Sequence, residues 1–157
     1  MVIPNYRQTV IAIIINSKGD ILITFNKRIN SVSSIYVDSH TYKFPQGGIE
    51  EGETRQFALV RELGEELGIT ANKDYVILQD DSSPVSYWFR NNDKPDFEIR
   101  LFPFLIKLLD DDCELICDPD EVSEFKWVKP ENVKDLNLGI RKDAYLNILS
   151  RFNLIKI

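Results

Sequence analysis

A segment from Gly47 to Ile69 concentrates six glutamates in one loop and the helix predicted to follow it. Like charges three and four positions apart on a helix repel each other by a few tenths of a kcal/mol per pair, so a fold gains nothing from this crowding. The neighbouring apolar stripe is formed by Leu59, Leu63 and Leu67. We expect these leucines to hold the helix against a core while an acidic side faces a cavity. That side is formed by Glu62, Glu65 and Glu66, whose carboxylates suit Mg²⁺ or Mn²⁺.

The spacing of this segment is more specific than its acidity. Gly47 is followed after five residues by Glu53, and after seven more by Arg61, which begins the run Arg-Glu-Leu-Gly-Glu-Glu-Leu-Gly-Ile. This pattern matches the signature of the Nudix hydrolases at every defined position, so the chain resembles a member of that family. An acidic, solvated helix is the plainest alternative, and the matching glycines and arginine disfavour it. We call residues 47–69 the glutamate box.

The resemblance implies a role for each charged residue of the box. The implied metal ligands are Gly47, Glu62, Glu65 and Glu66, of which Glu66 is the strongest candidate. Arg61 is implied to pair with Glu53 and so to tie the loop to the helix, although an ordinary surface ion pair is the alternative. The implied catalytic residues are Glu53, Arg61, Glu65 and Glu121. Either Glu65 or Glu121 would take the proton of the attacking water.

Small residues around the box predict its turns. Gly47, Gly48 and Gly52 allow a tight turn and a close approach of the backbone to a ligand. Thr54 stands just before the apolar-periodic stretch and is a candidate N-cap. Gly68 stands where a helix commonly ends in a left-handed residue. The sequence therefore predicts a loop, a capped helix and a defined end.

The rest of the chain alternates strand and turn patterns. The predicted strands are Gln8–Asn16, Ile21–Asn26, Tyr75–Gln79, Val85–Arg90, Glu98–Leu109 and Glu124–Val128. Asn30–Thr41 is polar and predicts a loop or hairpin excursion, and Pro130 can start a helical turn. Apolar residues every four positions in Ile140–Phe152 predict a final amphipathic helix. Strands that flank two helices predict an α/β fold, and the resemblance implies a Nudix-type α/β/α sandwich with a mixed β-sheet.

Composition agrees with a small cytoplasmic enzyme. At 157 residues, a single domain over residues 1–157 is expected. The net charge of −6 argues against broad nucleic-acid binding, which needs a basic surface. The apolar run Val10–Ile15 is far shorter than the roughly 20 residues of a membrane helix, so no membrane partner is expected. Cys113 and Cys117 are expected to be reduced, and His40 alone is too little for a zinc site.

Outside the box, Phe44–Ile49, Tyr6 with Arg7, and Arg28 resemble the branch of dinucleoside polyphosphate hydrolases and RNA pyrophosphohydrolases. The segment from Arg28 to Phe44 is longer than expected for that branch. The candidate substrate-binding residues are Arg7, Arg28, Lys43, Gln46 and Tyr87. The three cations among them can neutralise phosphates or be ordinary surface charges. The aromatic candidates for stacking on a base, or else for the core, are Tyr87, Phe89 and Phe104.

These observations predict a Mg²⁺-dependent hydrolase, with Mn²⁺ as a second candidate cofactor. It would cleave a phosphoanhydride in a nucleotide with a di- or polyphosphate, either a dinucleoside polyphosphate or a 5′-triphosphorylated RNA end. One alternative is a house-cleaning pyrophosphohydrolase of (deoxy)nucleoside triphosphates. The other is a regulator that binds nucleotides without turnover, which an intact box disfavours. The sequence leaves the oligomeric state open.

Overall fold

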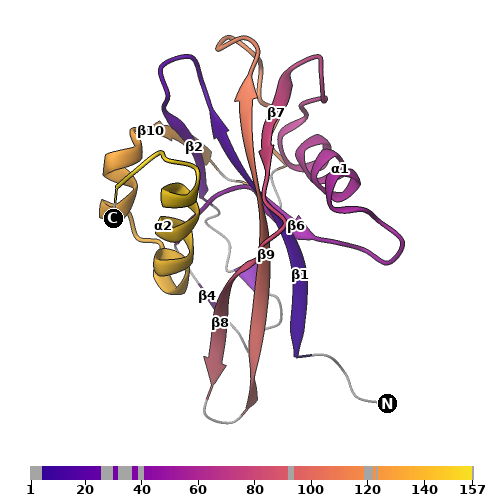
Figure 1. Ribbon diagram of the computed structural model, residues 1–157, viewed down its shortest axis with the longest axis vertical. Helices are drawn as coiled ribbons and strands as arrows, with labels where there is room; N and C mark the ends of the chain where they lie inside the picture. Colours follow the sequence, from indigo (N-terminus) through magenta and orange to yellow (C-terminus); the bar gives the residue numbers. More distant parts are fainter. Residues whose placement is uncertain are drawn as a thin grey trace.

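The computed structural model describes residues 5–25, 30–31, 37–38, 41–91, 94–118, 122 and 124–156 (Figure 1). Two long strands run side by side through its centre, β1 (Tyr6–Ile15) and β9 (Lys94–Leu108). They are parallel, in register from Tyr6 opposite Glu98 to Ile15 opposite Lys107. β1 is rich in β-branched residues and is buried on both faces in its second half, as expected where helices cover both sides of a sheet.

Within the described residues, eight strands form one mixed sheet around this pair. Its main order is β10-β2-β1-β9-β7, with β2 at Ile21–Phe25, β7 at Tyr75–Asp80 and β10 at Glu124–Val128. The strands off this path are β5 (Tyr42–Lys43) on β2, β6 (Gln46–Gly48) on β1 and β8 (Val85–Asn91) on β9. A separate pair joins β3 (Asn30–Ser31) to β4 (Val37–Asp38), which confirms a hairpin within the predicted excursion.

Both central strands change partners along their length. The N-terminal part of β1 pairs with β6 and its C-terminal end with β2, while β9 pairs first with β8 and then with β7. Pro103 lies in β9 between Leu101, the last residue paired with β8, and Phe104, the first paired with β7. A proline, which has no N–H to donate, is tolerated here because no partner strand needs that donor. The Pro103 carbonyl accepts from the Asp81 N–H at 3.0 Å.

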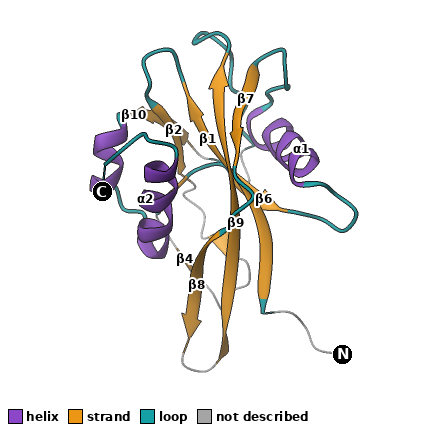
Figure 2. Cartoon of the chain, in the orientation of Figure 1, coloured by secondary structure: helices purple, strands orange, loops and turns teal. Residues whose placement is uncertain are grey.

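Two helices cover opposite faces of the sheet, α1 (Arg55–Leu67) and α2 (Lys142–Arg151) (Figures 1 and 2). The α1 core includes Ala58, Leu59, Leu63, Leu67, Val10, Ala12 and Ile14. The α2 core includes Ala144, Tyr145, Ile148, Leu149, Ile11 and Ile13. Successive residues of β1 thus supply the two cores alternately. Helices on both faces of a mixed sheet confirm the predicted α/β fold.

The caps of α1 are as the sequence predicts. The Thr54 hydroxyl accepts from the Phe57 N–H at 3.1 Å, and Gly68 ends the helix with φ of 66°. The backbone N–H groups of Ile116 and Asp118 donate to the carbonyls of Leu67 and Glu66, at 2.9 and 3.0 Å. The segment after β9 therefore fixes the C-terminal end of the helix that carries the acidic residues.

The C-terminal part begins with two 3₁₀ turns, η1 (Pro130–Asp135) and η2 (Gly139–Arg141). The start at Pro130 agrees with the prediction, and the final amphipathic helix is confirmed with Ala144, Ile148 and Phe152 buried, whereas the prediction for Ile140 was wrong. Ile140 is 46% exposed and Arg141 only 4%. The buried side of the helix is wider than the predicted stripe, because Arg141, Tyr145 and Leu149 are buried as well.

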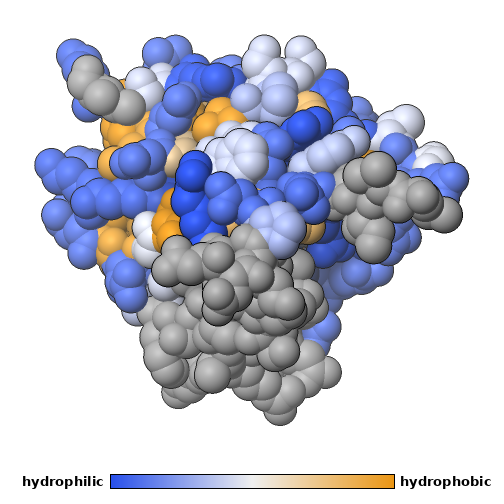
Figure 3. All heavy atoms as spheres, turned by 90° about the horizontal axis from the view of Figure 1, so that it is seen from below, coloured by the Kyte–Doolittle hydropathy of each residue, from blue (hydrophilic) through white to orange (hydrophobic). Residues whose placement is uncertain are grey.

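Hydrophilic residues cover most of the described surface in the view from below, and hydrophobic ones form small separate areas (Figure 3). The structure shows no helix within its described ranges that is long and apolar enough to cross a membrane.

Candidate active site

Arg61 is the central contact of the glutamate box. Its Nε and Nη2 donate to the two carboxylate oxygens of Glu53 at 2.7 and 2.8 Å, which is the predicted pair. Nη2 also donates to the Gly48 carbonyl at 3.0 Å. Nη1 donates to Glu62 at 2.8 Å and to Glu65 at 3.3 Å. A guanidinium has five N–H donors, and these five contacts use the whole fork to join loop, strand and helix.

This geometry sets the charge of Glu53. The hydrogen bonds from Arg61, followed by the backbone N–H of Glu50, lower the pKa of Glu53 to about 2. The same pairing raises the pKa of Arg61 above its ordinary value. Both groups therefore stay ionised across the whole neutral range. Glu53 lies away from the cavity lining described below, so its position fits a support for the loop.

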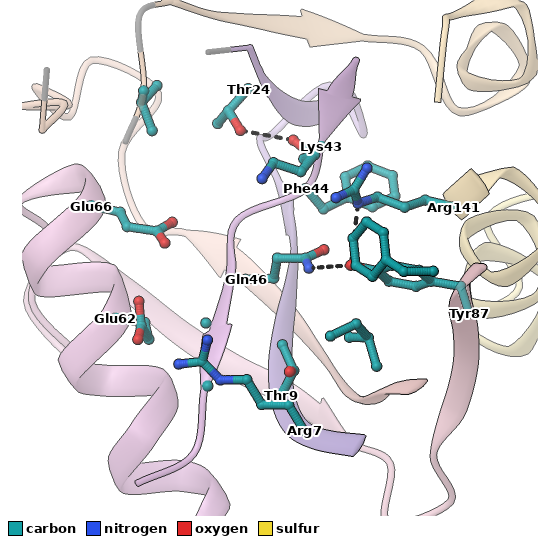
Figure 4. A pocket seen from close by; sticks show the side chains of 15 residues that line it. Arg7, Thr9, Thr24, Lys43, Phe44, Gln46, Glu62, Glu66, Tyr87 and Arg141 are labelled. Carbon is teal, nitrogen blue, oxygen red and sulfur yellow. Dashed lines mark hydrogen bonds between the residues drawn. The ribbon is translucent and has the colours of Figure 1, made fainter. Parts of the chain in front are cut away.

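Beside the box lies a cavity of about 300 Å³ (Figure 4). Its lining comprises Arg7, Thr9, Thr24, Lys43, Phe44, Gln46, Gly47, Gly48, Glu62, Glu66, Tyr87, Phe89, Ile99, Val122 and Arg141. The acidic residues extend from α1 on one side, and the cations and aromatic rings lie across from them. Strands β1, β5, β6, β8 and β9 supply most of the remaining lining. The partner changes of β1 and β9 thus occur around the site.

Two of the three predicted acidic ligands face this cavity. Glu62 and Glu66 differ by about 40° around the helix, whereas Glu65 is turned about 100° from Glu66. The Glu65 side chain is 60% exposed, contacts Arg61 and is not part of the lining. Glu66 is only 8% exposed. The structure therefore brings Glu62 and Glu66 together and leaves Glu65 on the outer side of the helix.

The surroundings of Glu62 and Glu66 fit a hard divalent cation. Burial raises the pKa of Glu62, against the pull of its hydrogen bond from Arg61. A Cβ on Gly47 would lie 2.0–2.3 Å from the Glu62 carboxyl group, so only glycine lets this carboxylate rest against the β6 backbone. Among the described residues there is no group of three or more His, Cys, Asp or Glu placed to hold a metal. One or two carboxylates that leave room for water and substrate oxygens are typical of Mg²⁺ sites.

Across the cavity lie the predicted cations. The Arg7 guanidinium rests against Gly48, where a Cβ would lie 2.1 Å from its Nε. The described residues offer Arg7 neither a hydrogen bond nor an ion pair. Lys43 extends from β5, which pairs with β2. Arg28 and Glu121 lie outside the described residues, and their predicted roles stay predictions.

The inner wall is aromatic and contains a residue that the sequence analysis missed. Tyr87 and Phe89 are 4% and 6% exposed and line the cavity, whereas the third aromatic candidate, Phe104, lies in the core beneath α1. The guanidinium of Arg141 lies 5.1 Å from the Tyr87 ring centre and 5.9 Å from that of Phe89. Burial lowers the pKa of Arg141. The one available signal was its four-residue spacing from Tyr145 and Leu149, which places a cation in a buried stripe.

The alternation of side chains along β8 and β9 separates other residues from the cavity. Trp88 is 39% exposed and points away from its neighbours Tyr87 and Phe89, as expected from strand alternation. Arg100 forms an ion pair at 3.1 Å with Glu98, two positions away on the same face of β9. Cys113 and Cys117 are both free.

Comparison with known proteins agrees with the geometry. The family model of the NUDIX domain matches residues 5–147. The chain is 27% identical to an RNA pyrophosphohydrolase of Novosphingobium aromaticivorans, over 94% of this chain and 92% of the relative. It is 31% identical to the RNA pyrophosphohydrolase of Zymomonas mobilis, over 71% and 77%. The structure of a MutT protein from Methanosarcina mazei has the same fold, with a TM-score of 0.67 at 21% identity, covering 98% of this chain and 99% of that one.

The match over almost the whole chain confirms the resemblance drawn from the box. The chain therefore belongs to the Nudix family and is a pyrophosphohydrolase, an enzyme that acts on acid anhydrides.

Proposed function

We propose that this protein is a divalent-metal-dependent hydrolase that removes pyrophosphate from the 5′-triphosphorylated end of RNA. The observation that carries the proposal is the division of the cavity by charge, with Glu62 and Glu66 on one side and Arg7 and Lys43 on the other. A polyphosphate needs both sides, because a cation held by the carboxylates and the protein's own cations together neutralise its oxygens. Relatives named RNA pyrophosphohydrolase support the RNA end as the substrate.

Glu62 and Glu66 would hold the cation, with Mg²⁺ as the first candidate and Mn²⁺ as the second. Bound there, such an ion supplies neutralisation of phosphate charge and activation of water at neutral pH. The Gly47 backbone lies against Glu62, and Arg61 fixes that carboxylate from the other side at 2.8 Å. These contacts orient Glu62 before the substrate arrives.

The cations across the cavity bind and orient the phosphates. Arg7 has no partner among the described residues, so its guanidinium can form a bidentate contact with phosphate oxygens. Lys43 adds a point charge on the same side. Together they would hold the chain of phosphates so that one phosphorus faces the acidic side of the cavity.

The group that takes the proton of the attacking water remains a choice between Glu65 and Glu121. Glu65 is 60% exposed and held by Arg61 on the outer side of α1, so it would have to turn towards the cavity. Glu121 follows from the resemblance alone. A Glu65→Gln variant tests the first choice, and a Glu121→Gln variant tests the second. The base is the residue whose replacement removes the acidic limb of the pH–rate profile.

A substrate panel tests the proposed function. We expect pyrophosphate release from a short 5′-triphosphorylated RNA in Mg²⁺, no turnover in chelator, and lower kcat/KM for diadenosine tetraphosphate and for free nucleoside triphosphates. Higher kcat/KM for diadenosine tetraphosphate would instead support a dinucleoside polyphosphate hydrolase. Higher kcat/KM for free triphosphates would support a house-cleaning enzyme. Nucleotide binding without turnover of any compound would indicate a regulator.

A cytoplasmic location and a single domain over residues 1–157 belong to the same proposal.

A further inference from the structure

A chain of hydrogen bonds crosses the inner wall of the cavity from α2 to β8. The Tyr145 hydroxyl donates to Gln46 Oε1. Gln46 Nε2 donates to the Tyr87 hydroxyl oxygen at 2.9 Å, and Arg141 Nε donates to the same oxygen at 3.2 Å (Figure 4). The wall thus holds the Tyr87 hydroxyl from two directions.

The direction of these bonds follows from burial. An amide can be turned so that Gln46 would donate to Tyr145 and accept from Tyr87. Tyr145 is fully buried. In the turned arrangement the Tyr145 proton would have no acceptor among the described residues, which is costly in the protein interior. In the arrangement present, the proton without an acceptor in the described part of the chain belongs to Tyr87, which lines the cavity.

The Tyr87 hydroxyl therefore accepts two hydrogen bonds and keeps its own proton to donate. The described residues include no acceptor for that proton. Burial raises the pKa of Tyr87 well above its ordinary value, so the hydroxyl stays protonated at neutral pH. Its ring is less available for stacking, because the Arg141 guanidinium lies over it at 5.1 Å and the Phe89 ring meets it at a T-shaped angle with centres 5.8 Å apart.

We propose that Tyr87 is a specificity residue that donates its hydroxyl proton to an acceptor on the substrate's nucleobase, either a carbonyl oxygen or a ring nitrogen. Arg141 and Gln46 are the positioning residues that aim this proton. The base is the source of the acceptor because Tyr87 lies beside the Phe89 ring and opposite Ile99 of β9, which are apolar parts of the lining, while the phosphates are drawn to Arg7 and Lys43. The inference rests on the proposed function and says which group of the site recognises the nucleobase of the substrate.

The test compares Tyr87→Phe with the parent on two substrates. One is a short 5′-triphosphorylated RNA, and the other is the same RNA without its first base. Loss of a hydrogen bond to an uncharged acceptor is expected to lower kcat/KM on the complete RNA by roughly 3- to 10-fold, mainly through KM. On the abasic RNA, Tyr87→Phe and the parent should agree within about twofold. Tyr75→Phe is the matched control, because the Tyr75 hydroxyl is buried in the other core and has no hydrogen-bond partner among the residues that the structure describes.

Two results would overturn the inference. Equal losses on both RNAs would assign Tyr87 to a phosphate contact or to a structural role, and no loss on either would remove it from recognition. A second measurement needs only the parent enzyme, which should have an at least threefold lower kcat/KM on the abasic RNA. Equal parent values on both RNAs would also contradict the inference. If the parent turned over neither RNA, the proposed function itself would fail, which is a separate outcome.

Discussion

At the scale of single residues, the box depends on one side chain more than on any glutamate. Arg61 uses all five of its donors, and four of them serve carboxylates. A lysine at this position offers a point charge and cannot reproduce the fork that joins Glu53 to the Gly48 carbonyl. The arginine is therefore an organiser, and the acidic residues around it divide into those it supports and those that face the cavity.

Replacing Arg61 with alanine should lower both activity and stability. We expect a roughly 10- to 100-fold loss of kcat/KM, because Glu62 and the loop lose their fixed positions. The melting temperature should also fall, since Glu53 loses its partner. Enzyme assays and thermal melts measure the two effects. Arg55→Ala is the control, because Arg55 lies on the same helix outside the cavity lining and pairs with Asp80 at 3.1 Å. An Arg61→Ala protein with parental activity and melting would refute the organising role.

Glu66→Gln should separate activity from stability. We expect turnover to fall by at least about 100-fold at saturating Mg²⁺, because a charged ligand is lost. Glu66 is 8% exposed and lies near Glu62. Removing one of two neighbouring buried charges should leave the melting temperature of the metal-free protein unchanged or raised. Glu51→Gln, in the exposed part of the loop, is the control. Turnover within a few-fold of the parent would mean that the chemistry lies elsewhere.

At the scale of elements, what could be predicted is what the chain encodes locally. Thr54 and Gly68 mark the two ends of α1, and the spacing of the box fixes Arg61 beside Glu53 because both lie within one loop and helix. The strand Glu124–Val128 matches its prediction residue for residue. The predicted start of one strand was wrong. β9 starts at Lys94, four residues before the predicted start at Glu98, and includes Pro95. Pairing with β8 extends the strand through this proline.

The inner wall could not be predicted in the same way. Gln46, Tyr87 and Arg141 come from β6, β8 and η2, and their contacts arise only when β9 and α2 place those elements together. No local pattern carries that information. For Glu65, the helical period alone gave the wrong expectation. The period places Glu65 near the acidic side of α1, but its contact with Arg61 holds the side chain outside the cavity.

Alanine substitutions at two glycines, one in β6 and one in α1, should have opposite effects on the protein. In Gly47→Ala the new Cβ would meet the Glu62 carboxyl at 2.0–2.3 Å, so the side chain must leave its place and activity should fall by at least about 100-fold. In Gly64→Ala the new Cβ meets nothing within 4 Å. Because Gly64 is in the interior of α1, alanine should stabilise the protein by about 0.5–1 kcal/mol and leave activity intact. Denaturant unfolding and turnover measure both; a fully active Gly47→Ala would contradict the close packing of Glu62.

At the scale of the whole molecule, two cores lie on the two faces of one sheet, and one charged cavity lies beside its central strands. Part of the net charge of −6 lies in the glutamate box, whose Glu62 and Glu66 face the cavity, so a bound cation should stabilise the entire fold. At 100 times its Kd, Mg²⁺ should add about 2.7 kcal/mol to the free energy of unfolding. Thermal melts across a Mg²⁺ titration measure this gain, which Glu66→Gln should largely lose and Glu51→Gln should keep. An equal gain in all three proteins would place the stabilising ion outside the cavity.

The parallel pairing of β1 with β9 also sets the order in which this site can form. Every paired position, from Tyr6 with Glu98 to Ile15 with Lys107, joins residues 92 positions apart in the chain. Contacts at such separations form late in folding, because the entropy of the long intervening loop must be lost before the strand pairing stabilises the chain. During synthesis, the residues of α1 and of both its caps emerge together, whereas the cavity must wait for β9 and then for Arg141. The glutamate box is therefore synthesised early, but its cavity is complete only after the C-terminal part of the chain has folded.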